Sequence, residues 1–257
     1  MDLLIQILIS GFIIGAIYAL GAAGEILGLI GPNGSGKSTT LLLNMGITHP
    51  DSGMIRLCGL DLSGLPTHAI TKAGMTMVFQ HSRPLRRQTV LENIQLALLP
   101  DSLLQWRIPP QLDQRAHEVA HQVGLSQALH QHPDSLPFAD LRRLEIAKAL
   151  ASSPRVLLLD EPFAGLAPRE TGEFSELFLA MRDAGCAIVL VDHNVKAVAR
   201  LVDRIAVMHA GSKIFEGSSS EATGNQRVKE VYFGKSLDAA QPPRGATTRT
   251  APSGNLL

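Results

Sequence analysis

The sequence predicts an α/β fold with a mainly parallel sheet. Short, wholly apolar segments alternate with amphipathic segments between about Glu25 and Gly234. Strands that are apolar throughout suit a sheet whose two faces are both covered by helices. A glycine-rich loop, Gly31–Ser38, stands between an apolar segment and a helical pattern, while Thr89–Ser152 contains helical patterns alone. These observations predict a phosphate-loop core with an inserted helical subdomain.

Composition narrows the possible functions. The 257 residues, 45% of them hydrophobic, are enough to bury a core. The chain has 23 basic and 23 acidic residues, so its formal net charge is zero. Nucleic-acid binding usually needs a basic excess, and we therefore expect no nucleic-acid partner. Two cysteines, Cys58 and Cys186, are too few for a disulfide framework and favour a reducing compartment.

The expected strands are the apolar segments of the central region. They are Glu25–Ile30, Met75–Phe79, Val156–Asp160, Ala187–Asp192 and Arg204–Met208. Helical patterns cover residues 90–99, 111–124, 141–152 and 169–182, and the first three place the helical subdomain at about residues 90–150. Residues 25–234 therefore form one domain. The tail, residues 235–257, is rich in Pro, Gly, Thr and Ala, and we expect it to be disordered.

The first 24 residues have a different character. Leu3–Gly24 contains no charged residue and as a helix would span ~33 Å, about the thickness of a bilayer core. We therefore expect a membrane-like apolar segment over residues 1–24. A signal peptide is the competing interpretation, but only Asp2, and no basic residue, precedes the run. A buried core helix is the other alternative.

The glycine-rich loop matches the pattern G-x-x-x-x-G-K-[ST] in a strand–loop–helix setting. Its residues are Gly31, Pro32, Asn33, Gly34, Ser35, Gly36, Lys37 and Ser38, with Thr39 following. Glycines let backbone N–H groups converge on phosphate, and the start of a helix adds partial positive charge. Lys37 is expected to reach the terminal phosphates, and the Ser38 hydroxyl to ligate Mg²⁺.

Two carboxylates end a second apolar segment. Asp160 and Glu161 follow Val156–Leu159, and ligands of open α/β sheets bind at the carboxyl ends of strands. Asp160 is thus expected to hold Mg²⁺, and Glu161 to orient or deprotonate a water. A helix N-cap would explain the two carboxylates equally well. The catalytic interpretation is favoured because a phosphate loop occurs upstream in the same sequence.

The motifs in this order resemble the ATP-binding subunits of ABC transporters, over about Glu25–Gly234. Gln80 in "VFQ" matches the family's glutamine loop, Leu136–Leu150 its signature motif and helix, and His193 in "VLVDHN" its switch histidine. The resemblance implies ATP and Mg²⁺ as cofactors. It also implies that Gln80 meets Mg²⁺ and positions water, and that His193 contacts the γ-phosphate.

Three segments are similar to the branched-chain amino acid subgroup: "RRLEIAKAL", "DEPFAGLAP" and "RVKEVYFG". The opening "GFIIGAIYALGA" is similar to the first helix of that system's permease. The resemblance implies an ATPase subunit of an importer at the cytoplasmic face of the inner (plasma) membrane. Its implied partners are transmembrane permease subunits, a second ATP-binding subunit, identical or different, and indirectly an external solute-binding protein.

The signature segment departs from the family. Pro137 offers neither hydroxyl nor N–H, Ala139 replaces glycine, and Asp140 brings a carboxylate where the family closes over a partner's γ-phosphate. We expect Asp140 to be the N-cap of a helix that starts at Leu141. The distal loop also ends in Ala167, where the family commonly has Asp or Asn.

The apolar run occupies the place of two strands and of an aromatic residue that stacks on adenine in the family. Phe12 and Tyr18 are the only aromatic residues there, and Gly53–Gly59 is expected to be an exposed sheet edge. The antiparallel subdomain is therefore expected to be depleted. One alternative function is a truncated or fused module that binds nucleotide without efficient hydrolysis. A DNA-repair or chromosome ATPase is disfavoured by the absence of net positive charge.

Overall fold

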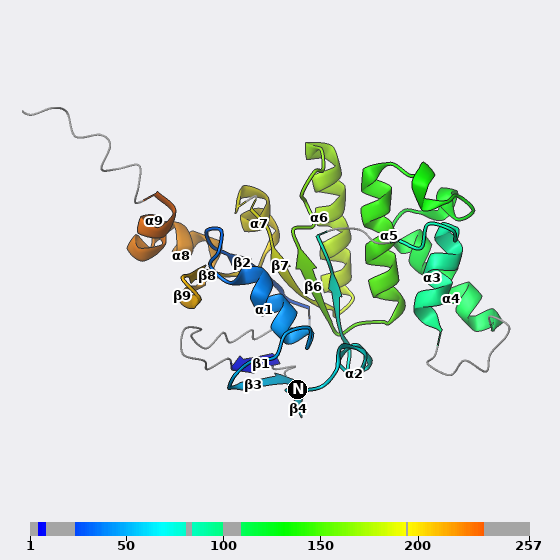
Figure 1. Cartoon of the computed structure of the whole chain (residues 1–257). Coiled ribbons are helices and arrows are strands. Elements are labelled where there is room, and N and C mark those ends of the chain that lie inside the picture. The colour runs from blue at the N-terminus through cyan, green and yellow to red at the C-terminus, as the bar shows by residue number, and fades with distance from the viewer. Residues whose placement is uncertain (1–4, 9–23, 81–83, 100–108, 194, 234–257) are drawn as a thin grey trace, which may run out of the picture.

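A six-stranded sheet forms the centre of the computed structural model (Figure 1), which describes residues 5–8, 24–80, 84–99, 109–193 and 195–233. The strand order is β5 (Met75–Val78), β6 (Val156–Asp160), β7 (Ala187–Val191), β2 (Ile26–Ile30), β8 (Arg204–His209) and β9 (Ser212–Gly217). The first five are parallel, and β9 is antiparallel to β8. The five predicted strands are therefore confirmed, and β9 is an addition.

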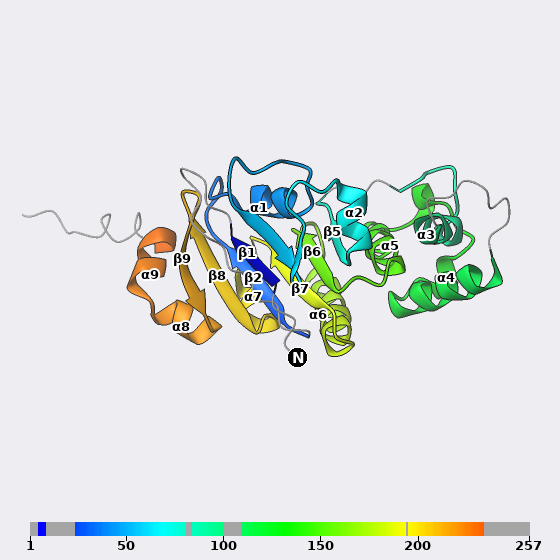
Figure 2. The same cartoon turned by 90° about the horizontal axis from the view of Figure 1, so that it is seen from below.

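Alternate residues of β2 enter two separate hydrophobic cores. Ile26 and Ile30 pack in one core with Phe174 of α6 (Pro168–Asp183), while Leu27 belongs to the other with Leu41 of α1 (Lys37–Asn44). Figure 2 shows the two layers: α1 and α2 (Thr67–Lys72) cover one face, and α6 and α7 (Val195–Leu201) the other. Burial on both faces explains why these strands are apolar throughout.

A small antiparallel sheet packs beside the α1 face. Its order is β1 (Ile5–Leu8), β3 (Met54–Leu57) and β4 (Leu60–Asp61), so β3 is its central strand. The exposed edge expected at Gly53–Gly59 is therefore wrong. A helix over Leu3–Gly24 is also wrong for Ile5–Leu8, which pair with β3 in the register Ile5↔Leu57 to Leu8↔Met54. The other residues of that run, with Phe12 and Tyr18, lie outside the described residues.

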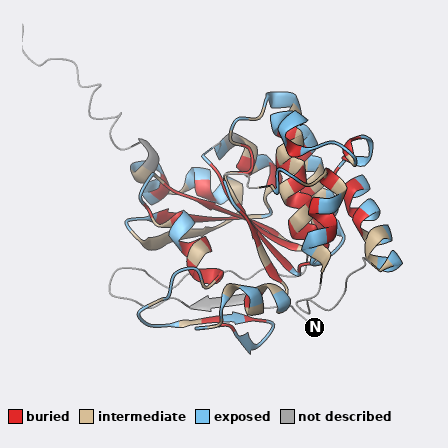
Figure 3. Ribbon diagram, turned by 45° about the vertical axis from the view of Figure 1, so that its right-hand side comes forward, coloured by how far each residue is buried: buried red, intermediate tan, exposed pale blue. Residues whose placement is uncertain are grey.

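The inserted subdomain consists of helices and adjoins the β5 edge. Its main elements are α3 (Val90–Leu98), α4 (Pro110–Gln122) and α5 (Phe138–Ala151), with short 3₁₀ turns at Ser126–Ala128 and Pro133–Ser135. Thr89 starts α3 with a capping box, because its hydroxyl accepts from the Glu92 amide while the Glu92 carboxylate accepts from the Thr89 amide. Figure 3 shows buried residues concentrated in the sheet and along α5.

Helices α8 (Ser219–Gly224) and α9 (Gln226–Phe233) lie against β9 at the other end of the sheet. The tail expected over residues 235–257 lies outside the described residues. Within the described ranges, none of the helices combines the length and the apolar character that a membrane span requires. The membrane-like segment over residues 1–24 stays a prediction apart from the four residues of β1.

The pairing of β1 with β3 can be tested in the full chain by substituting Gln6→Pro. Gln6 lies opposite Arg56, and the Ile55 amide donates to Ser63 Oγ on the β4 side (2.8 Å). Successive amides point to opposite neighbours, so the Arg56 amide faces β1. Because proline cannot join the ladder, we expect hydrogen exchange at Arg56 to speed up at least tenfold, with Ile55 unchanged. Equal Arg56 exchange in Gln6→Pro and in the control Gln6→Ala would contradict this register.

Candidate functional site

The predicted site residues follow four adjacent parallel strands at the same edge of the sheet. The glycine-rich loop follows β2, Gln80 follows β5, and His193 follows β7. Asp160 ends β6, and Glu161 comes directly after it. Because the strand order is β5-β6-β7-β2 and all four run parallel, their carboxyl ends lie side by side. The fold thus brings together residues that are up to 162 positions apart in the sequence, Gly31 and His193.

The loop forms a tight cradle before α1. The Ser35 amide donates to the Pro32 carbonyl (3.2 Å), and Gly34 and Gly36 have φ angles of 76° and 99°, a region that favours glycine. A Cβ atom on Gly31 would lie 2.3 Å from the Met208 carbonyl oxygen. The loop backbone is thus packed against β8, and its amides precede a helix N-terminus, the arrangement that suits phosphate.

Lys37 supplies the positive charge of this cradle. Its side chain is buried, and Nζ donates to the carbonyl oxygens of Gly31 (2.9 Å) and Pro32 (3.0 Å). Burial lowers the pKa of Lys37, while the nearby carboxylates Glu161 and Asp160 act in the opposite direction. The ammonium group therefore sits inside the loop, close to two acidic side chains.

Ser38 and Asp160 place two side-chain oxygen donors beside the cradle. Ser38 Oγ donates to Asp160 Oδ1 (3.2 Å). Burial raises the pKa of Asp160, and the hydrogen bond from Ser38 opposes this. A hydroxyl and a carboxylate are hard oxygen donors of the kind that Mg²⁺ prefers. These two residues therefore fit the expected metal-binding role, in a setting where a cation would favour the ionised form of Asp160.

Glu161 is held from several directions. Its φ angle is +50°, and its amide donates to the Val191 carbonyl at the end of β7 (2.7 Å). On its carboxylate, Oε2 accepts from Gln80 Nε2 (2.5 Å), and Oε1 contacts His193 Nε2. The three residues expected to act on water and on the γ-phosphate therefore form one contiguous cluster.

A cavity of about 300 Å³ joins the loop to this cluster. It is lined by Asn33, Gly34, Gly36, Lys37, Ser38, Thr39, Glu161 and His193. Gln80 and Asp160 line a neighbouring cavity of about 640 Å³ with Phe79 and Lys148. The predicted residues thus line two adjoining hollows, one of which has the backbone cradle, the cation and the oxygen donors that a nucleoside triphosphate with Mg²⁺ needs.

Sequence reasoning missed Asp192 and Arg142. Asp192 is buried and its Oδ2 accepts from the Phe163 amide (3.0 Å), which holds the turn after Glu161. Arg142 is buried in α5 and donates from Nη1 to the Phe79 carbonyl (2.9 Å). Asp192 could have been found from its place in "VLVDHN". Arg142 is one of several charged residues of α5, and nothing in the local sequence marks it as buried.

The signature segment forms the start of α5. The helix begins at Phe138 with Pro137 as N-cap, so the expectation that Asp140 caps a helix starting at Leu141 is wrong. Asp140 instead lies in the first turn and forms an ion pair with Arg143 Nε (3.6 Å). Burial raises the pKa of Asp140, and Arg143 opposes this. An acidic side chain in the first turn is favourable for the helix itself.

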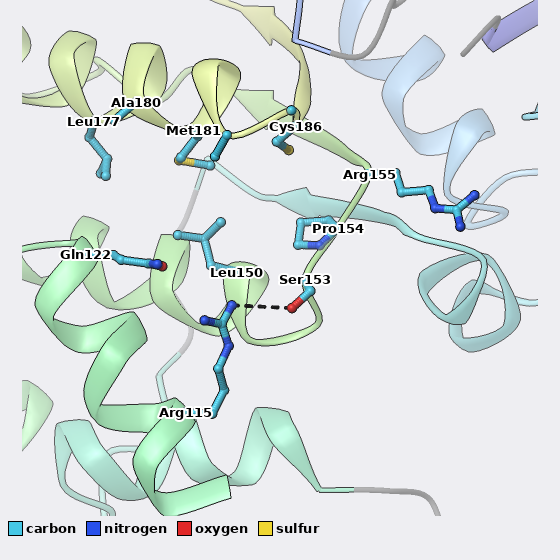
Figure 4. A pocket seen from close by; sticks show the side chains of 12 residues that line it. Arg115, Gln122, Leu150, Ser153, Pro154, Arg155, Leu177, Ala180, Met181 and Cys186 are labelled. Atoms are coloured by element: carbon cyan, nitrogen blue, oxygen red, sulfur yellow. Dashed lines mark hydrogen bonds between the residues drawn. The ribbon is translucent and has the colours of Figure 1, made fainter. Parts of the chain in front are cut away.

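A further cavity, of about 600 Å³, lies away from this site (Figure 4). It is lined by Leu150 of α5, Met181 of α6 and Cys186, and Arg115 of α4 donates to Ser153 Oγ at its rim (3.3 Å). Burial raises the pKa of the Cys186 thiol to about 11. The cavity is at the amino ends of β6 and β7, the opposite edge from the loop, and so it takes no part in the nucleotide site.

Comparison with protein families gives one match, to the family described as ABC transporter, over residues 21–164. Two similar curated proteins come from different systems. The lipopolysaccharide export system ATP-binding protein LptB of Haemophilus influenzae is 34% identical over 211 residues, 82% of this chain and 86% of that protein. The high-affinity branched-chain amino acid transport ATP-binding protein LivG of Salmonella typhimurium is 35% identical over 223 residues, 82% and 88%.

Solved structures have the same fold. A nucleotide-free ATP-binding cassette from an ABC transporter superposes with a TM-score of 0.79 at 25% identity, covering 91% of this chain and all of that chain. An ATP-binding cassette of an ABC transporter in its ADP conformation gives 0.80 at 25% identity, covering 91% and 99%. The predicted α/β phosphate-loop fold with its small antiparallel sheet is thereby confirmed.

Proposed function

Because this chain belongs to the ABC transporters as an ATP-binding subunit, we propose that its hydrolysis of ATP drives the uptake of branched-chain amino acids or related solutes. The observation that carries the ATPase chemistry is the contact of Gln80 and His193 with the two oxygens of Glu161, beside the Lys37 cradle. The importer assignment rests on the three subgroup-like segments and on the similarity to LivG.

Each residue of the cluster has a role that its position supports. The amides of residues 33–36 and the Lys37 ammonium bind the phosphates, with Thr39 at the start of α1. Ser38, Asp160 and Gln80 are the oxygen donors that hold Mg²⁺, which when bound neutralises phosphate charge. Glu161 orients or deprotonates the attacking water, and His193 steadies the γ-phosphate. This division assigns binding to the loop and turnover to the strand ends.

Substitution Glu161→Gln tests this division. It keeps the size of the side chain but removes the base, so kcat for ATP should fall at least a hundredfold. ATP affinity should stay within about threefold of the parent, because Lys37 and the loop are intact. Glu176→Gln, an exposed change on α6, is the matched control and should hydrolyse at the parent rate. A Glu161→Gln protein with parent kcat would refute the role of Glu161; a parent protein without hydrolysis would favour the non-hydrolysing alternative.

The second ATP-binding subunit would be needed to complete each site. In the family the first turn of the signature helix closes over the nucleotide of the opposite subunit; here that turn carries Ala139 and the partly buried Asp140. Its carboxylate, in the turn that closes over the partner's nucleotide, would repel a triphosphate. We therefore propose that this chain works in a dimer and that its own signature turn contributes weakly to the partner's site.

Substitution Asp140→Gln should raise ATP turnover about threefold to tenfold, because it removes a negative charge next to the partner's phosphates. Glu173→Gln is the control. It removes a negative charge that lies near Asp140 but belongs to α6, outside the signature turn. The measurement is ATPase rate against protein concentration, which detects dimerisation. Equal rates for Asp140→Gln, Glu173→Gln and the parent would show that Asp140 does not face the nucleotide.

A permease segment has a suitable docking place at the 640 Å³ cavity next to Gln80. The cavity is lined by apolar Leu42, Phe79 and Ala97, and residue Phe79 is 47% exposed. Leu85, which follows Gln80 in the sequence, and Leu96, the residue before Ala97, are also exposed. We propose that the permease docks here at the cytoplasmic face of the inner (plasma) membrane. An external solute-binding protein would then act on this chain through the permease alone.

Export is the second candidate, because LptB proteins match this chain at 34–35% identity, as LivG does. Complementation separates the two. We expect the chain, expressed with its own permease, to restore leucine uptake in a Salmonella typhimurium strain that lacks LivG. Lys37→Ala, which removes the phosphate-binding cation, should not. Restoration of lipopolysaccharide export in an Escherichia coli strain depleted of LptB, without leucine uptake, would replace the importer assignment by the exporter one.

A further inference from the structure

Arg142 is a buried cation that no role in the proposed chemistry uses. Only 4% of the residue is exposed, although it lies on α5, and its guanidinium Nη1 donates to the Phe79 carbonyl (2.9 Å). Within the described part of the chain, Arg142 Nε is buried without a hydrogen-bond partner. Burying a guanidinium group costs free energy, which indicates that the interactions of Arg142 have a specific role.

Phe79 is the residue directly before Gln80, and the side-chain amide of Gln80 donates from Nε2 to Glu161 Oε2. The hydrogen bond from Arg142 therefore fixes the backbone at the point where β5 ends and the Gln80 side chain begins. This bond spans 63 positions in the sequence and connects the helical subdomain with the sheet edge. A shift of α5 would move the Phe79 carbonyl and with it the Gln80 amide.

The same guanidinium also contacts the first turn of α5. It lies over the Phe138 ring, 5.5 Å from the centroid, and Phe138 is half exposed. Phe138 also lies against the loop after Glu161, since a Cβ atom on Gly165 would be 3.0 Å from Phe138 Cε1. Glu161 and Asp192 are among the carboxylates that act electrostatically on Arg142, whose pKa is lowered mainly by burial.

Taking the proposed role of Glu161 as its premise, we propose that Arg142 is a positioning residue that transmits the place of the signature turn to Glu161 through Phe79 and Gln80. Closure of a partner over Phe138 would thus reach the attacking water without any change in the phosphate loop. Removal of Arg142 leaves the Phe79 carbonyl without its donor and the Gln80 amide free to leave Glu161.

Arg143 shows that an arginine on the same helix need not serve this purpose. It donates to the Val123 carbonyl (2.9 Å) and to Glu173 (2.6 Å), and lies over the Phe174 ring. Those contacts connect α5 with the end of α4 and with α6, not with the end of β5. The link to the catalytic cluster is therefore a property of Arg142 in particular.

The test is the substitution Arg142→Met, which keeps the length and apolar stem of the side chain and removes the donor. We expect kcat for ATP to fall about tenfold while ATP affinity, measured by titration, stays within twofold. Arg204→Met is the control: Arg204 is also partly enclosed and pairs with Glu25 and Glu216, but it lies at the amino end of β8. It should lower Tm and leave kcat of the folded protein unchanged. An Arg142→Met protein with parent kcat would overturn the proposal.

A double-mutant cycle with Gln80→Ala separates positioning from a general loss of structure. If Arg142 acts through Gln80, Arg142→Met in the Gln80→Ala background should lower kcat by less than twofold further. If the two substitutions lower kcat independently, so that the fold-changes multiply in the double variant, the proposal is overturned. The two proposals can fail separately. If the role of Glu161 is wrong, the Glu161→Gln protein will hydrolyse ATP at the parent rate. If only the role of Arg142 is wrong, the Glu161→Gln protein will be inactive, and the effects of Arg142→Met and Gln80→Ala on kcat will multiply.

Discussion

The parallel pairing of β5, β6, β7 and β2 is the constraint on which the rest of the site depends. The registers Val78↔Leu159, Asp160↔Val191 and Leu29↔Val191 align the carboxyl ends of these strands. Main-chain hydrogen bonds fix this alignment, so the loops that follow the strands meet at one edge whatever their side chains. The two cores on either face then keep the sheet from sliding, because each strand contributes alternate residues to both.

This dependence explains which parts were predictable from the sequence. Strands buried on both faces leave an unmistakable apolar run, and the phosphate loop, Asp160, Glu161 and His193 each come directly after such a run. Strand β9 escaped notice because its six residues are all of intermediate burial and carry Lys213 and Glu216. The sheet order, and with it the contact between Gln80 and Glu161, depends on long-range pairing that no local pattern records.

The N-terminal run shows a different limit. A charge-free segment satisfies the composition of a membrane helix, a core helix and a buried strand alike, and length alone favoured the first. For Ile5–Leu8 the deciding factor is a partner: β3 has one side bonded to β4 and offers its other side to β1. The hairpin between β3 and β4 turns at Cys58 and Gly59, with φ angles of 51° and 82°, which sets the twist of that small sheet. The pairing thus gives the small antiparallel sheet its third strand.

The residues of the site divide into two groups according to the elements that carry them. Lys37, Ser38, Glu161 and His193 line the 300 Å³ cavity, and Ser38 donates to Asp160 at the end of β6. The packing of both cores restricts movement on this side of the site. Gln80 and Arg142 instead lie where the end of β5 meets the helical subdomain. Relatives from a lipopolysaccharide export system and from branched-chain amino acid transport match this chain at 34% and 35% identity. This is the expected result if the sheet edge defines the reaction while the α5–β5 boundary and the cavity beside Phe79 determine which permease uses it.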